Sequence, residues 1–164
     1  MRSPVPGLVR SLKALDGILR KGEDFCLANS LDTRELLDAR VAPTMKPLTH
    51  QIRLACDHAA TAVARLSGRD AVTVDGAYET FGDLYASIAA AQVIIESLPT
   101  EDVGAFEQCT LRLALDDRTV VCTGYDYLMQ YAIPNFYFSV TTAYIILRGK
   151  GVPLGKNDFL GPWA

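Results

Sequence analysis

Between Met45 and Leu66, apolar residues recur at alternating steps of three and four residues. This spacing forms one apolar seam along a helix and is typical of helices that pack nearly antiparallel in a bundle. It predicts a helix from about Thr44 to Ser67, which ends near Gly68, and its alanines should let a neighbouring helix approach closely. The seam positions are Met45, Leu48, Ile52, Ala55, Ala59, Ala62 and Leu66.

Two further segments have the same helical period. The first runs from about Pro4 to Asn29 and carries one apolar stripe. The second runs from Phe81 to Leu98, and Thr80 immediately before it is a good N-cap. Together with the seam helix, these segments predict three helices of a bundle.

The remaining sequence predicts a β-hairpin followed by a fourth helix. Leu111–Leu115 alternates apolar with other residues, and Arg118–Val121 follows it after a short acidic turn. Thr123–Asp126 is typical of a helix start, and the helix should run from Tyr125 to about Arg148. The predicted fold is therefore an all-α four-helix bundle with a short β-hairpin before the last helix.

The predicted last helix has almost no polar face. A helix that is apolar all round is buried on more than one side. A membrane span is one interpretation, because the apolar run is about 20 residues long. Pro134 and several polar residues interrupt the run, which favours a central helix that packs on its own bundle and on a second subunit. We therefore expect a homodimer and no membrane association.

Composition bounds the domain count, the class of partner and the location. A chain of 164 residues predicts one domain over residues 1–164. The net charge is −3 and no basic stripe with interleaved aromatics is present, which argues against a nucleic-acid partner. The four cysteines are widely spaced without a CxxC pair, and the N-terminus has no secretory apolar region. These features predict reduced thiols and a cytoplasmic location.

Several longer motifs carry a family resemblance over nearly the full chain. They are Ala39–Leu48, Ala55-Cys56-Asp57, Thr123–Leu128, Pro134–Phe138, Thr141–Tyr144 and Gly151–Lys156. They resemble a bacterial and fungal family known as domain of unknown function nineteen-ninety-three, in the DinB/YfiT-like superfamily. The resemblance implies a DinB-like four-helix bundle that is commonly dimeric. It implies no activity, because none is established for the family.

The resemblance also implies where a metal would bind. DinB-like metal proteins hold the ion with one histidine from the second helix and two from the last helix. At that spacing the last helix offers Ser139 and Ala143, and neither replaces an imidazole. His50 and His58 are eight residues apart, about 12 Å along one helix, so they cannot share an ion without distortion. We predict no metal and no other cofactor, with His50 facing solvent or a subunit contact.

A ligand pocket is predicted beside Pro134, because proline frees a carbonyl near Gln130 and can kink the helix. Such a kink beside polar side chains can open a pocket between helices. Alternatively, the side chain of Asn135 satisfies the freed carbonyl. The candidate pocket residues are Asn135, Tyr137, Tyr85 and Tyr144.

No catalytic residue can be assigned. Cys56 and His58 are two residues apart and face different directions on a helix, so Cys56 is interpreted as core. The predicted function is a non-metal small-molecule-binding or interaction protein. The alternative is an enzyme related to DinB-like thiol transferases, with an absent or substituted metal site.

Overall fold

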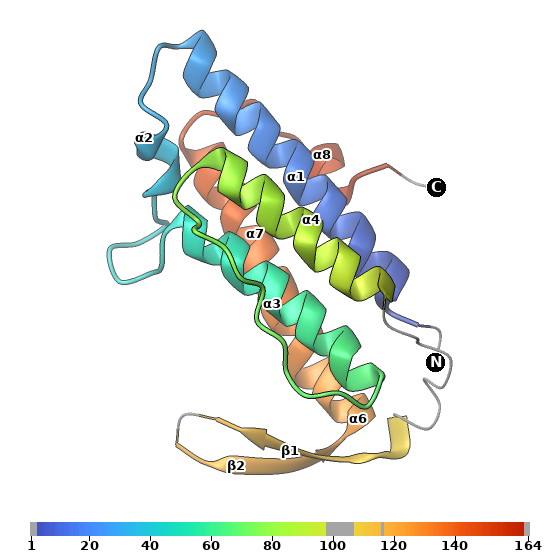
Figure 1. The fold of residues 1–164 in the computed structure, drawn as a ribbon. Helices are drawn as coiled ribbons and strands as arrows, with labels where there is room; N and C mark the ends of the chain where they lie inside the picture. The colour runs from blue at the N-terminus through green and yellow to red at the C-terminus, as the bar shows by residue number, and fades with distance from the viewer. Residues whose placement is uncertain (1–2, 98–106, 116, 163–164) are drawn as a thin grey trace.

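The computed structural model describes residues 3–97, 107–115 and 117–162. Four long helices form a bundle, and a short antiparallel hairpin precedes the last of them (Figure 1). This arrangement confirms the predicted fold. The elements are α1 (Val5–Ala28), α3 (Leu48–Leu66), α4 (Phe81–Ser97), β1 (Thr110–Ala114), β2 (Thr119–Thr123) and α7 (Ile133–Gly149).

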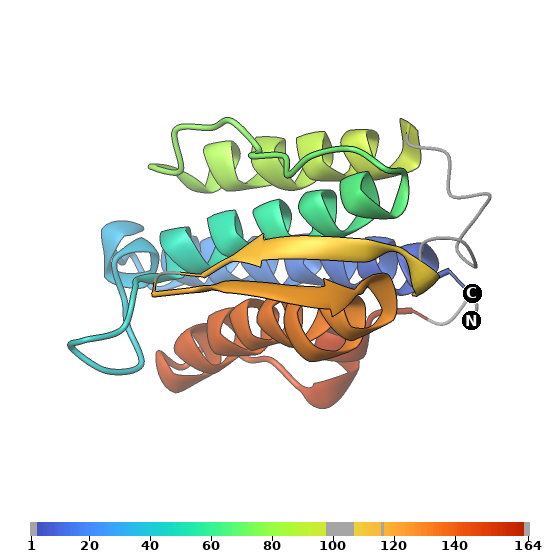
Figure 2. The same ribbon diagram turned by 90° about the horizontal axis from the view of Figure 1, so that it is seen from below.

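The second and third long helices along the chain, α3 and α4, run in the same direction, while α1 and α7 run the opposite way (Figure 1). Two successive parallel helices need a connection that travels back along the first one. The 19 residues of α3 span about 28 Å. Residues 67–80, called the return segment below, cover this length in a largely extended course. Figure 2 shows the same segment alongside α3 and α4.

The core lies where the apolar faces of the four long helices meet. α3 packs most extensively on its antiparallel neighbour α7, and next on α4. Ala55 and Ala59 of α3 are completely buried. Their small side chains allow the close approach that the seam predicted. Phe136 of α7 is the largest fully buried side chain among the described residues.

The predicted last helix is divided into three parts. A short α6 (Gly124–Asp126) leads into a π-helix, η1 (Tyr127–Ala132), and α7 then begins with Pro134 in its first turn. Proline has no N–H group and therefore cannot donate the helical hydrogen bond to the carbonyl four residues earlier. The wider π turn lies directly before this position, as expected where the helical hydrogen-bond ladder is interrupted.

One helix boundary differs from the sequence prediction, and two short helices add to the four long ones. The helix predicted from the apolar seam begins at Leu48 rather than Thr44, because its N-cap Pro47 is extended. Two short helices, α2 (Arg34–Leu37) and α8 (Lys156–Leu160), complete the described fold. Within the described ranges, no helix is long and apolar enough to cross a membrane.

Candidate functional site: a basic pocket at the start of α3

The side chain of Asn135 bonds a backbone carbonyl of η1, next to the carbonyl of Gln130 that Pro134 leaves without its helical donor. The side-chain amide of Asn135 donates to the carbonyl of Tyr131 at 2.7 Å. The acceptor lies one residue after Gln130, close to the position that the sequence predicted. This bond gives Asn135 a structural role, and a ligand contact by the same side chain stays a prediction.

Tyr85 of α4 contacts α1 through both its hydroxyl and its ring. The hydroxyl donates to a carboxylate oxygen of Glu23 at 2.7 Å, and the guanidinium of Arg20 lies 4.3 Å from the ring centroid. Burial raises the pKa of Tyr85, and the neighbouring Glu23 carboxylate raises it further. The phenol therefore stays protonated and acts as a hydrogen-bond donor between the two helices.

The two candidate tyrosines of α7 contact other elements. The hydroxyl of Tyr137 lies 3.3 Å from the hydroxyl of Ser11 on α1. The ring of Tyr144 packs edge-on against Phe159 of α8, with centroids 5.8 Å apart. Each of the four sequence candidates thus has a different partner, and none of them lines the pocket at the start of α3.

The residues at the metal positions of DinB-like proteins do not fit a metal ion. Ser139 and Ala143 are buried on α7, and both histidines lie on α3. The ring of His58 packs edge-on against the ring of Tyr131, with centroids 6.4 Å apart. Across the described parts of the chain, no three histidine, cysteine or acidic side chains come together as a ligand set.

Cys56 belongs to the core, as its position beside the seam predicted. Its side chain is fully buried on α3. Burial, together with a smaller effect of the nearby carboxylate of Asp57, raises the pKa of the Cys56 thiol to about 12. The thiolate is the nucleophilic form of cysteine. Cys56 is therefore a poor nucleophile at neutral pH.

A pocket of about 290 Å³ opens at the N-terminal end of α3. The first turns of α3 form one side, the loop before the helix forms a second, and the end of the return segment forms the third. This volume is near the lower end of the range for small-molecule sites. The lining residues are Arg40, Lys46, Pro47, Thr49, His50, Arg53, Gly76, Ala77 and Tyr78.

Basic side chains dominate this pocket, which is called the basic pocket below. Arg40, Lys46 and Arg53 carry formal positive charges, and none of the described lining residues is acidic. Burial lowers the pKa of His50, and the positive charges of Lys46 and Arg53 lower it further. His50 is half-buried and lines the pocket together with residues 76–78 of the return segment. The formal charges among the described lining residues are therefore all positive.

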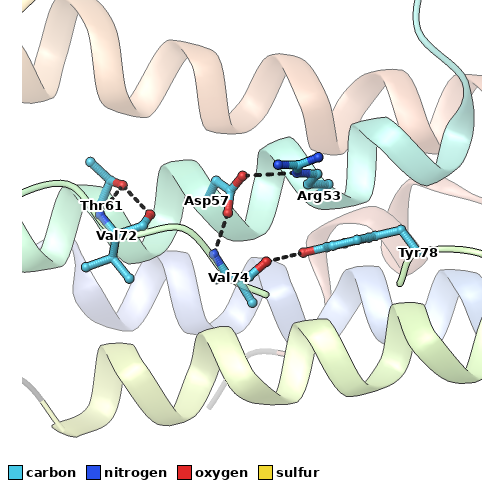
Figure 3. Close-up of polar contacts among 6 residues, drawn as sticks. All are labelled: Arg53, Asp57, Thr61, Val72, Val74 and Tyr78. Carbon is cyan, nitrogen blue, oxygen red and sulfur yellow. Dashed lines mark hydrogen bonds and ion pairs between the residues drawn. The ribbon is translucent and has the colours of Figure 1, made fainter. Parts of the chain in front are cut away.

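Side chains of α3 hold the return segment in place (Figure 3). The carboxylate of Asp57 accepts a hydrogen bond from the backbone N–H of Val74 at 2.7 Å and lies 3.7 Å from the guanidinium of Arg53. One turn further along, the hydroxyl of Thr61 both donates to the carbonyl of Val72 and accepts from its N–H group. These bonds fix the segment that forms the third side of the basic pocket.

The end of the return segment adopts a conformation that few sequences allow. Tyr78 has a φ of 55°, in the left-handed region that is uncommon for residues other than glycine. Its hydroxyl donates to the carbonyl of Val74 at 3.0 Å, which fixes the ring. A Cβ atom added at Gly76 would lie only 2.5 Å from the hydroxyl of Ser87 on α4. The pocket wall is thus closely fitted to the two helices behind it.

Sequence reasoning did not identify the basic pocket, because its residues come from three separated segments. A partial signal was present. Lys46, His50 and Arg53 recur at steps of four and three residues, and would share one side of a helix that began at Thr44. In the structure Lys46 instead lies in the loop before α3. The third side of the pocket, formed by residues 76–78, depends on the course of the return segment. No periodic pattern in the sequence specifies that course.

Comparison with known proteins agrees with this fold. The family model described as "Domain of unknown function (DUF1993)" matches residues 2–160. The crystal structure of a DinB family member protein from Shewanella denitrificans is 32% identical, with a TM-score of 0.85, and the match covers 97% of this chain and 90% of that one. No protein with a curated description matches the chain. The chain therefore belongs to the family described as Domain of unknown function (DUF1993), and its fold is that of the DinB-like four-helix bundles.

Proposed function

We propose that this protein binds a small molecule without a metal ion, and that the ligand occupies the basic pocket. The observation that carries the proposal is the convergence of polar and charged side chains from three segments on one hollow of about 290 Å³. A concave site with a few convergent polar groups is the usual form of a small-molecule site.

The fixed wall of the pocket supports a binding role. Asp57 and Thr61 tie the return segment to α3, and Arg40 closes the opposite loop by donating to the carbonyl of Met45 at 2.7 Å. A site whose walls are already ordered loses less conformational entropy when a ligand binds. These contacts therefore favour binding by a preformed site.

A wider hollow at the start of α1 has a volume of about 780 Å³. Its lining combines aliphatic side chains with Arg10, Lys13 and the oppositely charged Glu96. It does not present charges of one sign to a ligand. The basic pocket is favoured for this reason, although it is smaller.

A pocket-filling variant tests the proposal. Ala77 is exposed and lines the basic pocket, so Ala77→Trp should fill the hollow without changing the core. Ala86→Trp, at an exposed position on α4, is the matched control. We expect a collection of small acids, phosphate esters, sugars and amino acids to contain a compound that raises the unfolding temperature of the wild type and of the control.

The same compound should lose its effect on Ala77→Trp. If it stabilises Ala77→Trp as strongly as the wild type, the ligand site lies elsewhere. Tyr85→Phe and Asn135→Ala then test the candidates that the sequence suggested. Catalytic consumption of a thiol would instead favour an enzyme related to DinB-like thiol transferases.

The proposal includes the absence of a bound metal in the purified protein. The motivation is the donor set, since Ser139 and Ala143 stand where the last helix would need imidazoles. Elemental analysis should find no stoichiometric zinc, nickel or iron. One tightly bound ion per chain that is lost in His50→Ala would overturn this part.

We also propose a cytoplasmic homodimer that forms through the outer face of η1 and α7. Met129, Phe138 and Ile145 are exposed on this face, by 42%, 60% and 48% respectively. Tyr127 of η1 is buried, at 3% exposure, and does not belong to this face. A large apolar patch on a protein surface marks an interaction site, and a two-fold contact covers such a patch on both partners.

A further inference from the structure

We infer that the ligand of the basic pocket carries a phosphate monoester group. This inference rests on the proposed function, because it specifies the chemical class of ligand for the same pocket. It follows from the charge balance of the pocket, the spacing of its donors and the chemistry of their head groups.

The charge balance favours a dianion. Arg40, Lys46 and Arg53 contribute three positive charges around the hollow. One carboxylate, Asp57, lies 3.7 Å from the guanidinium of Arg53 and offsets part of its charge. For the lining side chains together with the Asp57 carboxylate, the balance is about two positive charges. A phosphate monoester carries about −1.5 to −2 charges at neutral pH, which matches this surplus.

The basic side chains of the pocket come from neighbouring segments around one hollow. Lys46 lies in the loop just before α3, His50 and Arg53 lie on the first two turns of α3, and all three line the same hollow. Lysine offers an ammonium group that binds as a point charge, and arginine offers a planar fork that fits two phosphate oxygens. A phosphate monoester is tetrahedral and has three terminal oxygens, so it can accept hydrogen bonds from several directions at once.

The start of α3 adds a weaker contribution of the same sign. Among the described residues, no side chain caps this helix, and its first turn contains no acidic residue. The N-terminal end of a helix carries a partial positive charge, which an anion can neutralise. This feature supports the inference only because the cavity and the three basic side chains are present at the same end.

The acidic residues of the return segment lie outside the lining of the basic pocket. Asp75 and Glu79 flank the pocket wall in sequence, but neither lines the pocket. The carboxylate of Asp57 already accepts from the N–H of Val74. The side chains that face the hollow are therefore basic or neutral.

Calorimetric titration of the 164-residue chain tests the inference. The probes are inorganic phosphate, glycerol 3-phosphate and succinate, at matched ionic strength. We expect saturable binding of both phosphates, and clearly weaker binding of succinate, whose two charges are separated. Lys46→Gln and Arg53→Gln should each weaken phosphate binding about tenfold, the usual effect of losing one charged contact.

The matched control is Lys150→Gln, which removes a positive charge from an exposed position after α7, outside the pocket. It should leave the phosphate affinity within about twofold, because an exposed charge away from the site is screened by salt. Circular dichroism of each variant verifies that the fold is intact. Equal losses in all three variants would mean only a general effect of net charge and would overturn the inference.

Two further results would also overturn it. One is the absence of saturable phosphate binding, and the other is succinate binding as tight as that of phosphate. Suppose that a neutral compound stabilises the wild type but not Ala77→Trp, while phosphate does not bind. In that case the proposed function stands and the phosphate inference is wrong. Vesicles of phosphatidylcholine with added phosphatidic acid show whether the phosphate belongs to a lipid headgroup or to a free metabolite.

Discussion

His58 shows how burial changes the behaviour of a single residue in this bundle. It is half-buried on α3 and packs edge-on against the ring of Tyr131. Burial lowers its pKa from the usual value near 6.5, and the neighbouring carboxylate of Asp57 opposes part of this shift. The neutral imidazole is therefore the form that the folded protein prefers.

This shift predicts a loss of stability in mild acid. Below about pH 6.5, the unfolded chain binds a proton at His58 that the folded protein does not yet bind. The stability that the protein gains by keeping His58 neutral is fully present above the pKa of the unfolded state. It is lost as the pH falls from that value towards the lower pKa of the folded state. The free energy of unfolding should fall between about pH 7.5 and pH 5 more steeply for the wild type than for His58→Phe. Equal slopes in urea titrations would contradict this assignment.

At the scale of elements, the orientation of α3 is a direct consequence of its seam. Ile52 is completely buried, whereas His50 lies outside the seam at the edge of the basic pocket. Ile52→Asp places an unpaired charge in the core and should unfold or aggregate the protein, at a cost of several kcal/mol. His50→Ala should remain within about 0.5 kcal/mol of the wild type. Similar unfolding midpoints for the two variants would show that the helix is rotated differently.

The return segment supports a separate prediction about Asp57. Removing its carboxylate leaves the N–H of Val74, a residue with 2% exposure, without its acceptor. Asp57→Ala should therefore lower the free energy of unfolding by about 1–3 kcal/mol. It should also make residues 67–80 more sensitive to limited proteolysis.

Asp70→Ala is the control, because Asp70 is exposed in the same segment. It should change neither the unfolding free energy nor the cleavage pattern by a measurable amount. If Asp57→Ala behaves like Asp70→Ala, the bond from Val74 does not hold the return segment.

Elements with a regular apolar period could be predicted from the sequence, and those that depend on long-range contacts could not. The seam predicted α3, because burial at every third or fourth position is a local pattern. The π turn of η1 was not predicted, since proline predicts an interruption without specifying how the chain adjusts. The parallel direction of α4 was also missed, because the return segment has neither period nor turn motif.

The candidate site shows the same division. The sequence indicated that Asn135 would satisfy a freed carbonyl or line a pocket, and the structure shows a bond to the carbonyl of Tyr131. It contained no indication that Arg40 and Gly76 would lie around the same hollow as Arg53. Residues that meet only through tertiary structure leave no pattern in the order of the chain.

At the scale of the whole molecule, the apolar face of η1 and α7 predicts self-association. Sedimentation equilibrium at micromolar concentration should give a dimer of about 36 kDa, twice the chain mass of 17.9 kDa. A stable contact should bury on the order of 1,500 Å² in total. Phe138→Glu should shift the protein to monomer, because it places charges in the centre of the contact.

Val93→Glu provides the matched control for this prediction. Val93 is 66% exposed on α4, away from the proposed contact. This variant should sediment as the wild type does. A wild-type protein that sediments as a clean monomer would contradict the proposed homodimer.

Nuclear magnetic resonance tests directly whether this bundle binds a small molecule in the basic pocket. Amide chemical shifts are recorded while the most stabilising compound of the ligand screen is added to the folded protein. We expect the largest shifts at residues 46–53 and 76–78, and we expect them to disappear in Ala77→Trp. Shifts centred on Tyr85, Asn135, Tyr137 and Tyr144, with none around His50, would show that the ligand binds elsewhere and that the basic pocket is not the site.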